Sequence, residues 1–169
     1  MAEEIFNAIM ISSSLRSEFS GDISDIHTQS KNRVVARVKP ESIIEVSKHL
    51  LSSLKYDHLA CVCGLDYPDH LDVVYHIESY EHPVVLTLKA TVPKDNPVIE
   101  SVVPIWWNAN WYERETYELM GIKFNNHPNL IHLILPEEML GEYPLRKDYE
   151  KFPDTNVRNP IFVKEKESW

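Results

Sequence analysis

The amino-acid sequence predicts an α+β fold in two layers, an antiparallel sheet of about four strands with helices packed on one face. Three observations favour this class. Two segments have apolar residues at helical spacing, four short runs are strand-like, and the connections between the last three runs are too short for a parallel crossover. A third helix and an extended C-terminal arm are expected to follow, so the chain divides into an α+β domain over 1–135 and an arm over 136–169.

The two helices that cover the sheet are expected early in the chain. A helix is predicted over 4–19, where apolar residues recur at helical spacing and Gly21 follows as a stop. Residues 33–39 are β-branched and predict a strand. Pro40 then opens a second helix over 40–54, whose apolar stripe includes Ile43, Ile44, Leu50, Leu51 and Leu54.

Three further strands are predicted over 58–65, 71–79 and 83–92. The stretches that separate them, DYPDH and YEHP, have the residues of short turns. Strands joined by such short connections must be antiparallel neighbours. Together with 33–39 they form the expected sheet of about four strands.

A helix is expected after the sheet, because PKDNP (93–97) breaks the last strand and a new apolar and aromatic segment begins. Asn110 is its candidate N-cap, and Glu113 three positions later completes a capping box. Gly121 supplies the C-terminal stop.

Residues 136–169 have no helical or alternating pattern and are predicted to form an extended arm. Such an arm cannot bury its own aromatic side chains, whereas a disordered tail normally lacks them. A receiving surface is therefore expected, and we predict that the arm wraps a partner subunit. The arm contains four prolines and five aromatic residues: Pro136, Pro144, Pro153, Pro160, Tyr143, Tyr149, Phe152, Phe162 and Trp169.

The charge of the chain argues against nucleic acid and anionic lipid as partners. Acidic residues outnumber Lys and Arg by 26 to 17, which leaves a formal net charge of -9. The sequence contains no apolar stretch near the ~18 residues that span a bilayer, and its start carries acids where a secretory signal has a basic region. We expect no direct membrane insertion and a cytoplasmic location.

Neither a metal site nor a nucleophile is predicted. Cys61 and Cys63 lie two apart in a predicted strand, so they share a face and are interpreted as buried, reduced thiols. Two cysteines are too few for a zinc or iron–sulfur site. The histidines form no His-x-x-x-His pair and there is no HExxH motif. His127, just before Pro128, is expected to hold a turn rather than a metal.

A pair of glutamates keeps one catalytic alternative open. Glu115 and Glu118 approach one face of the predicted helix and could serve a small acid/base enzyme. Arg114, however, lies four residues before Glu118, the spacing of an intrahelical ion pair that keeps the carboxylate charged. We therefore assign no catalytic residue.

The same helix lacks a single dry face, because its large apolar and aromatic residues are spread around the cylinder. A surface helix is normally amphipathic, so this helix is expected to be covered from more than one side. Trp, Tyr and Arg are also typical of interface hot spots. An interface helix and an internal core helix both remain open. The dispersed residues are Trp107, Trp111, Tyr112, Tyr117, Leu119 and Met120.

Two blocks of sequence resemble the 30 kDa subunit family of respiratory complex I, known as the C or J subunit in NDH-type dehydrogenases. The first is ERETYELMGIKFNNHPNL (113–130) and the second is YPLRKDY (143–149). The resemblance extends over about 33–150. The chain departs from the family pattern at Glu118, where Asp is usual, and at Ile131 and His132, where two arginines are usual, which suggests a divergent branch.

The resemblance implies a non-redox structural subunit that binds no cofactor itself. Its partners would be the 49 kDa-type subunit and the subunit that holds the terminal iron–sulfur cluster. The whole hetero-oligomeric complex would pass electrons from NADH, reduced deazaflavin or ferredoxin through flavin and iron–sulfur clusters to a membrane quinone-type acceptor, coupled to proton translocation. It would lie peripherally on the cytoplasmic side of the cell membrane, or on the stromal side of a thylakoid.

Other functions stay open beside this one: a subunit of a complex I-like membrane-bound hydrogenase, a free-standing binding module, or the small acid/base enzyme. For the structural subunit, we expect a set of residues from the two matching blocks to fix and anchor the interface. The expected anchors are Trp111, Glu113, Arg114, Glu115, Glu118, Gly121, His127, Pro128, Arg146, Lys147 and Asp148.

Overall fold

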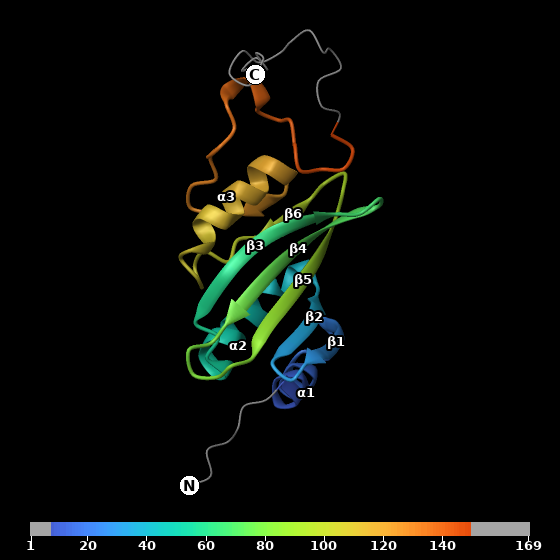
Figure 1. Cartoon of the computed structure of the whole chain (residues 1–169), viewed down its shortest axis with the longest axis vertical. Coiled ribbons are helices and arrows are strands. Elements are labelled where there is room, and N and C mark those ends of the chain that lie inside the picture. The colour runs from blue at the N-terminus through green and yellow to red at the C-terminus, as the bar shows by residue number, and fades with distance from the viewer. Residues whose placement is uncertain (1–7, 150–169) are drawn as a thin grey trace, which may run out of the picture.

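A computed structural model describes residues 8–149 of the chain. Its main sheet has five strands in the order β1-β2-β5-β4-β3, and α1 and α2 cover one face of it (Figure 1). The predicted α+β class, with helices on one face of a sheet, is confirmed. A shorter pair of strands, β6 and β7, lies beyond the main sheet with the third helix.

The two covering helices form where the apolar spacing predicts them. α1 spans Ala8–Glu18, and residues 4–7 of the predicted helix lie outside the described residues. A 3-10 turn over Pro40–Ser42 leads into α2, Ile43–Leu54. α2 ends at Lys55, which adopts a left-handed conformation with φ 58° and donates its N–H to the Leu50 carbonyl.

The strands joined by short turns form the expected antiparallel meander. β3 spans His58–Asp66, β4 His70–Glu78 and β5 Val85–Pro93, and each pairs antiparallel with the next. Along β5, buried and half-buried residues alternate from Val85 to Val92. This alternation is typical of a sheet with one face in the core and one face left open by its own chain.

Two features of the sheet differ from the prediction. β1, Ile23–Ser30, was not expected, because it is a polar edge strand in which only Ile23 and Ile26 are buried. β2, Arg33–Val38, pairs antiparallel with β1 but parallel with β5, so the sheet is mixed and has five strands rather than about four antiparallel ones. The parallel pair is possible because a long connection through α2, β3 and β4 separates its two strands.

The third helix, α3, spans Ala109–Met120 and lies along the free edge of β3 (Figure 1). Asn108 donates its side-chain amide to the Leu59 carbonyl at 2.6 Å, and a Cβ on Gly64 would lie only 2.9 Å from Met120 Cγ. The absence of a side chain at Gly64 therefore allows the helix to approach the strand. The short strands β6 (Val98–Glu100) and β7 (Lys123–Asn125) pair in parallel on either side of α3 in the sequence.

Candidate functional site

The N-terminal end of α3 is built differently from the predicted capping box. The helix is preceded by Asn108, not Asn110, and no side chain caps it. Glu113 instead accepts hydrogen bonds from the Ser101 hydroxyl at 2.6 Å and the Val102 N–H at 2.8 Å. The capping-box prediction is wrong because Glu113 faces the interior, where the loop before the helix supplies the donors.

The buried Glu113 carboxyl has an unusual protonation equilibrium. Burial raises its pKa to about 7, although the hydrogen bonds from Ser101 and Val102 oppose the shift. His127 Nε2 lies 4.0 Å from a Glu113 oxygen, and neither side chain is exposed to solvent. Burial also lowers the pKa of His127. Both shifts favour the neutral side chains, so Glu113 and His127 pack α3 against the chain beyond β7 without forming a strong ion pair.

His127 holds a turn, as its place before Pro128 predicts. Its Nδ1 accepts the Asn129 N–H at 3.0 Å, and its Nε2 lies 3.2 Å from the Asn110 carbonyl. Since Nδ1 is an acceptor, the proton of the neutral ring must be on Nε2, which can then donate to Asn110. Pro128 itself is exposed. The histidine thus ties the turn after β7 back to the start of α3.

Arg114 and Glu118 do not pair with one another, so the predicted intrahelical ion pair is wrong. Arg114 donates from Nε to the Ile131 carbonyl and from Nη2 to the His132 carbonyl, both at 3.0 Å. The Glu118 carboxylate accepts three consecutive backbone N–H groups, those of Leu133, Ile134 and Leu135, at 3.1, 2.7 and 2.8 Å. We call residues 131–135 the clamped segment.

The clamp recognises backbone atoms and leaves the side chains of the clamped segment largely free. Extended backbone without a neighbouring strand has unpaired polar groups, which α3 satisfies here with one guanidinium and one carboxylate. The departures at Ile131 and His132 are compatible with this arrangement, because Arg114 bonds only their carbonyls. The His132 ring lies beside the clamp, with Nδ1 3.7 Å from Glu118 Oε1. Ile131 and Ile134 consequently expose their side chains to solvent.

The second matching block fastens to the C-terminal end of α3. Gly121 ends the helix with a left-handed φ of 72°, as predicted. Arg146 donates from Nε to the Met120 carbonyl at 2.7 Å, and its guanidinium lies 4.5 Å from the centre of the Tyr143 ring. A Cβ on Gly121 would lie 2.7 Å from Tyr143 and 2.8 Å from Arg146. Glycine is therefore required here both by conformation and by space.

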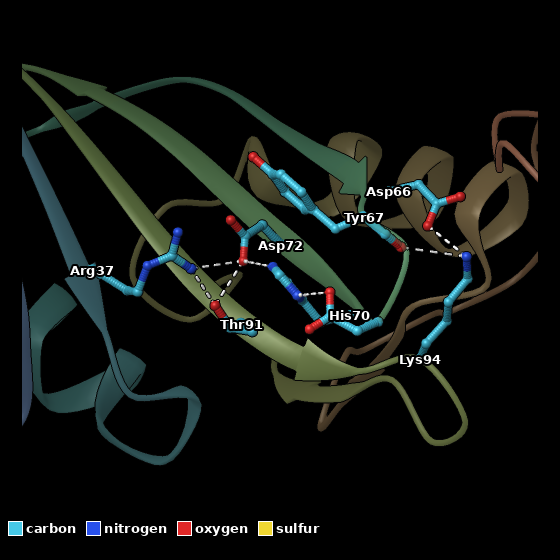
Figure 2. A network of polar contacts seen from close by, with 8 residues as sticks. Arg37, Asp66, Tyr67, His70, Asp72, Thr91 and Lys94 are labelled. Carbon is cyan, nitrogen blue, oxygen red and sulfur yellow. Dashed lines mark hydrogen bonds and ion pairs between the residues drawn. The ribbon is translucent and has the colours of Figure 1, made fainter.

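The next two residues of the arm fasten to the end of the sheet. The Lys147 N–H donates to Asp66 Oδ2 at 2.7 Å, and Lys94 Nζ lies 2.8 Å from Asp66 Oδ1 and 3.4 Å from Asp148. Figure 2 shows Lys94 reaching across to Asp66. Burial raises the pKa of Asp66, but Lys94 and the Lys147 N–H outweigh it and lower that pKa. Residue spacing does not single out Lys94 or Asp66, which lie at strand ends.

The described part of the arm, 136–149, thus makes contacts with its own chain. Its one regular element is a 3-10 turn, η2, over Glu137–Met139. The Leu145 N–H donates to the Leu119 carbonyl at 3.1 Å, while the Leu145 side chain remains exposed. The arm residues Phe152, Pro153, Pro160, Phe162 and Trp169 lie outside the described residues.

α3 is covered from two sides by its own chain, which agrees with the lack of a single dry face. Its buried positions face β3 and the clamped segment, whereas Trp111 and Glu115 lie one turn apart on the uncovered side. Trp107 lies in the turn just before the helix. Trp107 is 75% exposed and Trp111 60% exposed. The Arg114 guanidinium lies 5.2 Å from the centre of the Trp111 ring.

The two glutamates of the catalytic alternative are not brought to a common site. Glu115 is exposed on the uncovered side of α3, and Glu118 is buried and bonded to the clamped segment. Across 8–149, no group of three or more His, Cys, Asp or Glu residues could hold a metal ion. Cys61 and Cys63 are free thiols and are half-buried rather than fully buried. Burial raises the pKa of both thiols.

Among the described helices, none has the length and apolar character needed to cross a membrane. The exposed side chains of Trp107 and Trp111 lie close together in the sequence around the start of α3, and we call this pair the tryptophan stripe. The C-terminal arm is held to the rest of the chain at several points. This arrangement is suited to presenting a rigid surface.

Comparison with known proteins identifies relatives over nearly all of the described chain. Residues 36–154 match the family described as "Respiratory-chain NADH dehydrogenase, 30 Kd subunit". A subunit of the F(420)H(2) dehydrogenase of Methanosarcina mazei is 56% identical over 157 residues, which cover 92% of this chain and 99% of the relative. A subunit of the NADH-quinone oxidoreductase of Geobacter metallireducens is 39% identical, covering 80% of this chain and 85% of the relative.

A solved structure shares the fold of almost the whole chain. A chain of the membrane-bound sulfane sulfur reductase, described as an archaeal respiratory membrane complex, superimposes with a TM-score of 0.81 over 95% of both chains. The two are 20% identical, so this similarity concerns the fold alone.

Proposed function

Because the chain belongs to the 30 kDa subunit family of respiratory-chain NADH dehydrogenases, we propose that it is a structural subunit of a complex I-like oxidoreductase. It lies in the peripheral arm and carries no redox group. The complex passes electrons from a reduced carrier through flavin and iron–sulfur clusters to a membrane quinone-type acceptor and couples this to proton translocation. The family match over most of the chain is the observation that carries the proposal.

The electron donor of the complex is reduced deazaflavin. Support comes from the 56% identity with a subunit of an F(420)H(2) dehydrogenase over nearly the full length of both chains. The NADH-quinone oxidoreductase relative from Geobacter metallireducens is 39% identical over a shorter region. NADH is accordingly the second candidate donor, and a donor assay on the purified complex separates the two.

The chain contributes rigidity rather than chemistry. The region after α3 is fastened at three separate places. Arg114 and Glu118 bond the clamped segment, Arg146 bonds the end of α3, and Asp66 accepts the Lys147 N–H. A misplacement of reacting groups by about 1 Å can lower a rate on the order of 100-fold, so a subunit that fixes its neighbours is valuable to electron transfer. The neighbours it holds are a 49 kDa-type subunit and the subunit with the terminal iron–sulfur cluster.

The tryptophan stripe is the primary docking surface for these neighbours. Trp107 and Trp111 expose most of their rings, and large aromatic residues near an arginine are typical of interface hot spots. Ile131 and Ile134 of the clamped segment add further exposed apolar groups. In the cell, the complex is attached peripherally to the cytoplasmic side of the membrane.

The test is affinity purification of the tagged chain from its host under mild detergent. We expect it to co-elute with iron–sulfur subunits and a membrane part, and the eluate to reduce a quinone analogue with F(420)H(2) much faster than with NADH. Replacing Trp111 by Ala should reduce recovery of the other subunits, whereas Tyr80→Ala, at another exposed ring, should not. A monomeric chain that turns over a small molecule by itself contradicts the proposal.

A further inference from the structure

The open face of the main sheet, opposite α1 and α2, carries an ordered array of side chains. Strand register places Val35, Thr87, His76 and Cys61 in one row across β2, β5, β4 and β3. The next row consists of Arg37, Lys89, Val74 and Cys63. The first row is completed by a bond between Thr87 Oγ1 and His76 Nδ1 at 3.0 Å.

Apart from Cys61, the residues of these rows form the floor of a hollow of about 360 Å³. β1 supplies one wall with His27 and Gln29, and Leu65 lies toward the other side. The floor is partly apolar, since Val35 and Val74 contribute to it. The two covering helices, α1 and α2, lie on the opposite face of the sheet (Figure 1).

The charges of the hollow are basic and incompletely neutralised. Arg37 is satisfied by Asp72 at 2.8 Å and also donates to Thr91, as Figure 2 shows. In contrast, Arg33 and Lys89 take part in none of the ion pairs formed within 8–149. Their positive field is felt at His76.

The pKa of His76, on the floor of the hollow, is lowered from its ordinary value. Burial lowers its pKa, and the charges of Arg33 and Lys89 lower it further, while Glu78 at the edge of the face acts in the opposite sense. The acidic residue that lines the hollow is Asp25, which lies 3.5 Å from His27 on the same strand. The surplus of positive charge therefore belongs to Arg33 and Lys89.

Lys89 is a cation without an acidic partner in the described part of the chain. It stands directly opposite Arg37 in the parallel pair of β2 and β5. Asp72 neutralises Arg37, whereas Lys89 has no acidic partner among the ion pairs formed within 8–149. A cation kept at this position is explained by an anionic group that approaches from outside.

We infer that the open face of the sheet binds an acidic segment of a second subunit, whose Asp or Glu side chains pair with Lys89 and Arg33. Apolar side chains of the same segment lie over Val35 and Val74. A protein segment is favoured over a small anion because the hollow spans several strands and is partly apolar. The inference rests on the proposed function, and it gives the chain two docking surfaces, one on α3 and one on the sheet.

Photo-cross-linking in the assembled complex identifies the occupant. p-Benzoylphenylalanine at Gln29, an exposed position on the rim of the hollow, is irradiated in the purified complex and the adduct is sequenced. The expected product is a peptide of another subunit that contains Asp or Glu. A lipid adduct, a small-molecule adduct, a peptide without acidic residues, or no adduct overturns the inference.

Charge reversal tests the pairing itself. Lys89→Glu should weaken retention in the complex at least about tenfold. The thermal stability of the isolated chain should change little, because Asp72 already pairs with Arg37. Lys89→Arg should retain assembly. Lys39→Glu, exposed just beyond β2 and outside the hollow, is the matched control and should change neither property. Arg33→Glu provides a second, exposed reversal.

The outcomes separate the inference from the proposed function. If the wild-type chain co-elutes with no iron–sulfur subunits, the proposed function fails and the inference falls with it. If the wild-type chain co-elutes and both Lys89→Glu and Arg33→Glu assemble as well as Lys39→Glu, the inference alone is wrong.

Discussion

Arg114 and Glu118 stand one helical turn apart on α3 and divide the backbone of the clamped segment between them. The arginine takes two successive carbonyls, and the glutamate takes the three N–H groups that follow. The positive side chain thus binds backbone carbonyls, and the negative side chain binds the backbone N–H groups that come next in the sequence. The residue types are set by the polarity of the groups they bind, and not by attraction to each other.

Glu118→Gln should destabilise the protein by about 2 kcal/mol, because an amide cannot accept three N–H groups as a carboxylate does and leaves donors unpaired. Urea unfolding measures the loss, and amide exchange should accelerate at Leu133, Ile134 and Leu135. Glu115→Gln, on the exposed side of the same helix, is the control and should change stability by less than about 0.5 kcal/mol. Equal effects of the two changes contradict the clamp.

Arg114→Lys should also destabilise the protein, by about 1–2 kcal/mol, although the charge is kept. A single ammonium cannot reproduce the fork that reaches the carbonyls of Ile131 and His132, and it stacks less well on Trp111. Guanidinium unfolding measures the effect. Adding Glu118→Gln to Arg114→Lys should cost less than the sum of the two single changes, since both release the same segment. Strict additivity would show that the two residues act separately.

Gly121→Ala should detach the arm as well as strain the helix end. The left-handed φ costs about 1 kcal/mol for alanine, and its Cβ would collide with Tyr143 and Arg146. Limited proteolysis between 136 and 149 should accelerate. Gly141→Ala is the control, because Gly141 also has a positive φ, of 90°, but no atom lies within 4 Å of the added Cβ. Gly141→Ala should show only the cost of the positive φ. Equal proteolysis of both variants would contradict a collision between the Gly121→Ala side chain and Tyr143 or Arg146.

Glu113 predicts a pH dependence of opposite sign from that of a typical carboxylate. Burial raises its pKa in the folded chain to about 7, from 4.5. Below about pH 4.5 the group is protonated in both states and costs nothing; as pH rises toward 7, the unfolded chain loses the proton first and the folded state loses stability. The loss amounts to about 3 kcal/mol at pH 7 and above.

Glu113→Gln removes this titration and keeps an oxygen acceptor for Ser101 or Val102. The free energy of unfolding of the variant minus that of the wild type should therefore rise between pH 4.5 and pH 7 and then level off. Urea titrations of both proteins across pH 4.5–8 measure it. A difference that does not change with pH would mean that Glu113 stays ionised in the folded protein.

Much of the fold follows from local patterns. The meander of β3, β4 and β5 follows from alternation and short turns, and α2 follows from an apolar stripe after Pro40. β1 escaped prediction because an edge strand buries few side chains and so lacks the alternation that marks a strand. The parallel pairing of β2 with β5 escaped because it joins segments about fifty residues apart, with no local signal of direction.

The candidate site divides in the same way. The two matching blocks single out Arg114, Glu118, Gly121 and Arg146, and the left-handed helix end at Gly121 is foreseen from its position alone. The partners of these residues are not foreseen: a helical spacing of four suggested that Arg114 bonds Glu118, whereas both bond the clamped segment. Lys94 and Asp66 were missed because nothing in their own neighbourhoods marks them.

By itself, the sequence determined the three helices, the strands β2 to β5 and the residue at which α3 ends, and its two matching blocks indicated the family. Only the tertiary structure decided which backbone groups the buried charges satisfy and which face of the sheet stays open. The physical reason is range: periodicity and turn chemistry act between residues within a few positions of each other. A buried Arg, Glu or Asp takes whatever donor or acceptor the closed fold brings within about 3 Å, from any distance along the chain.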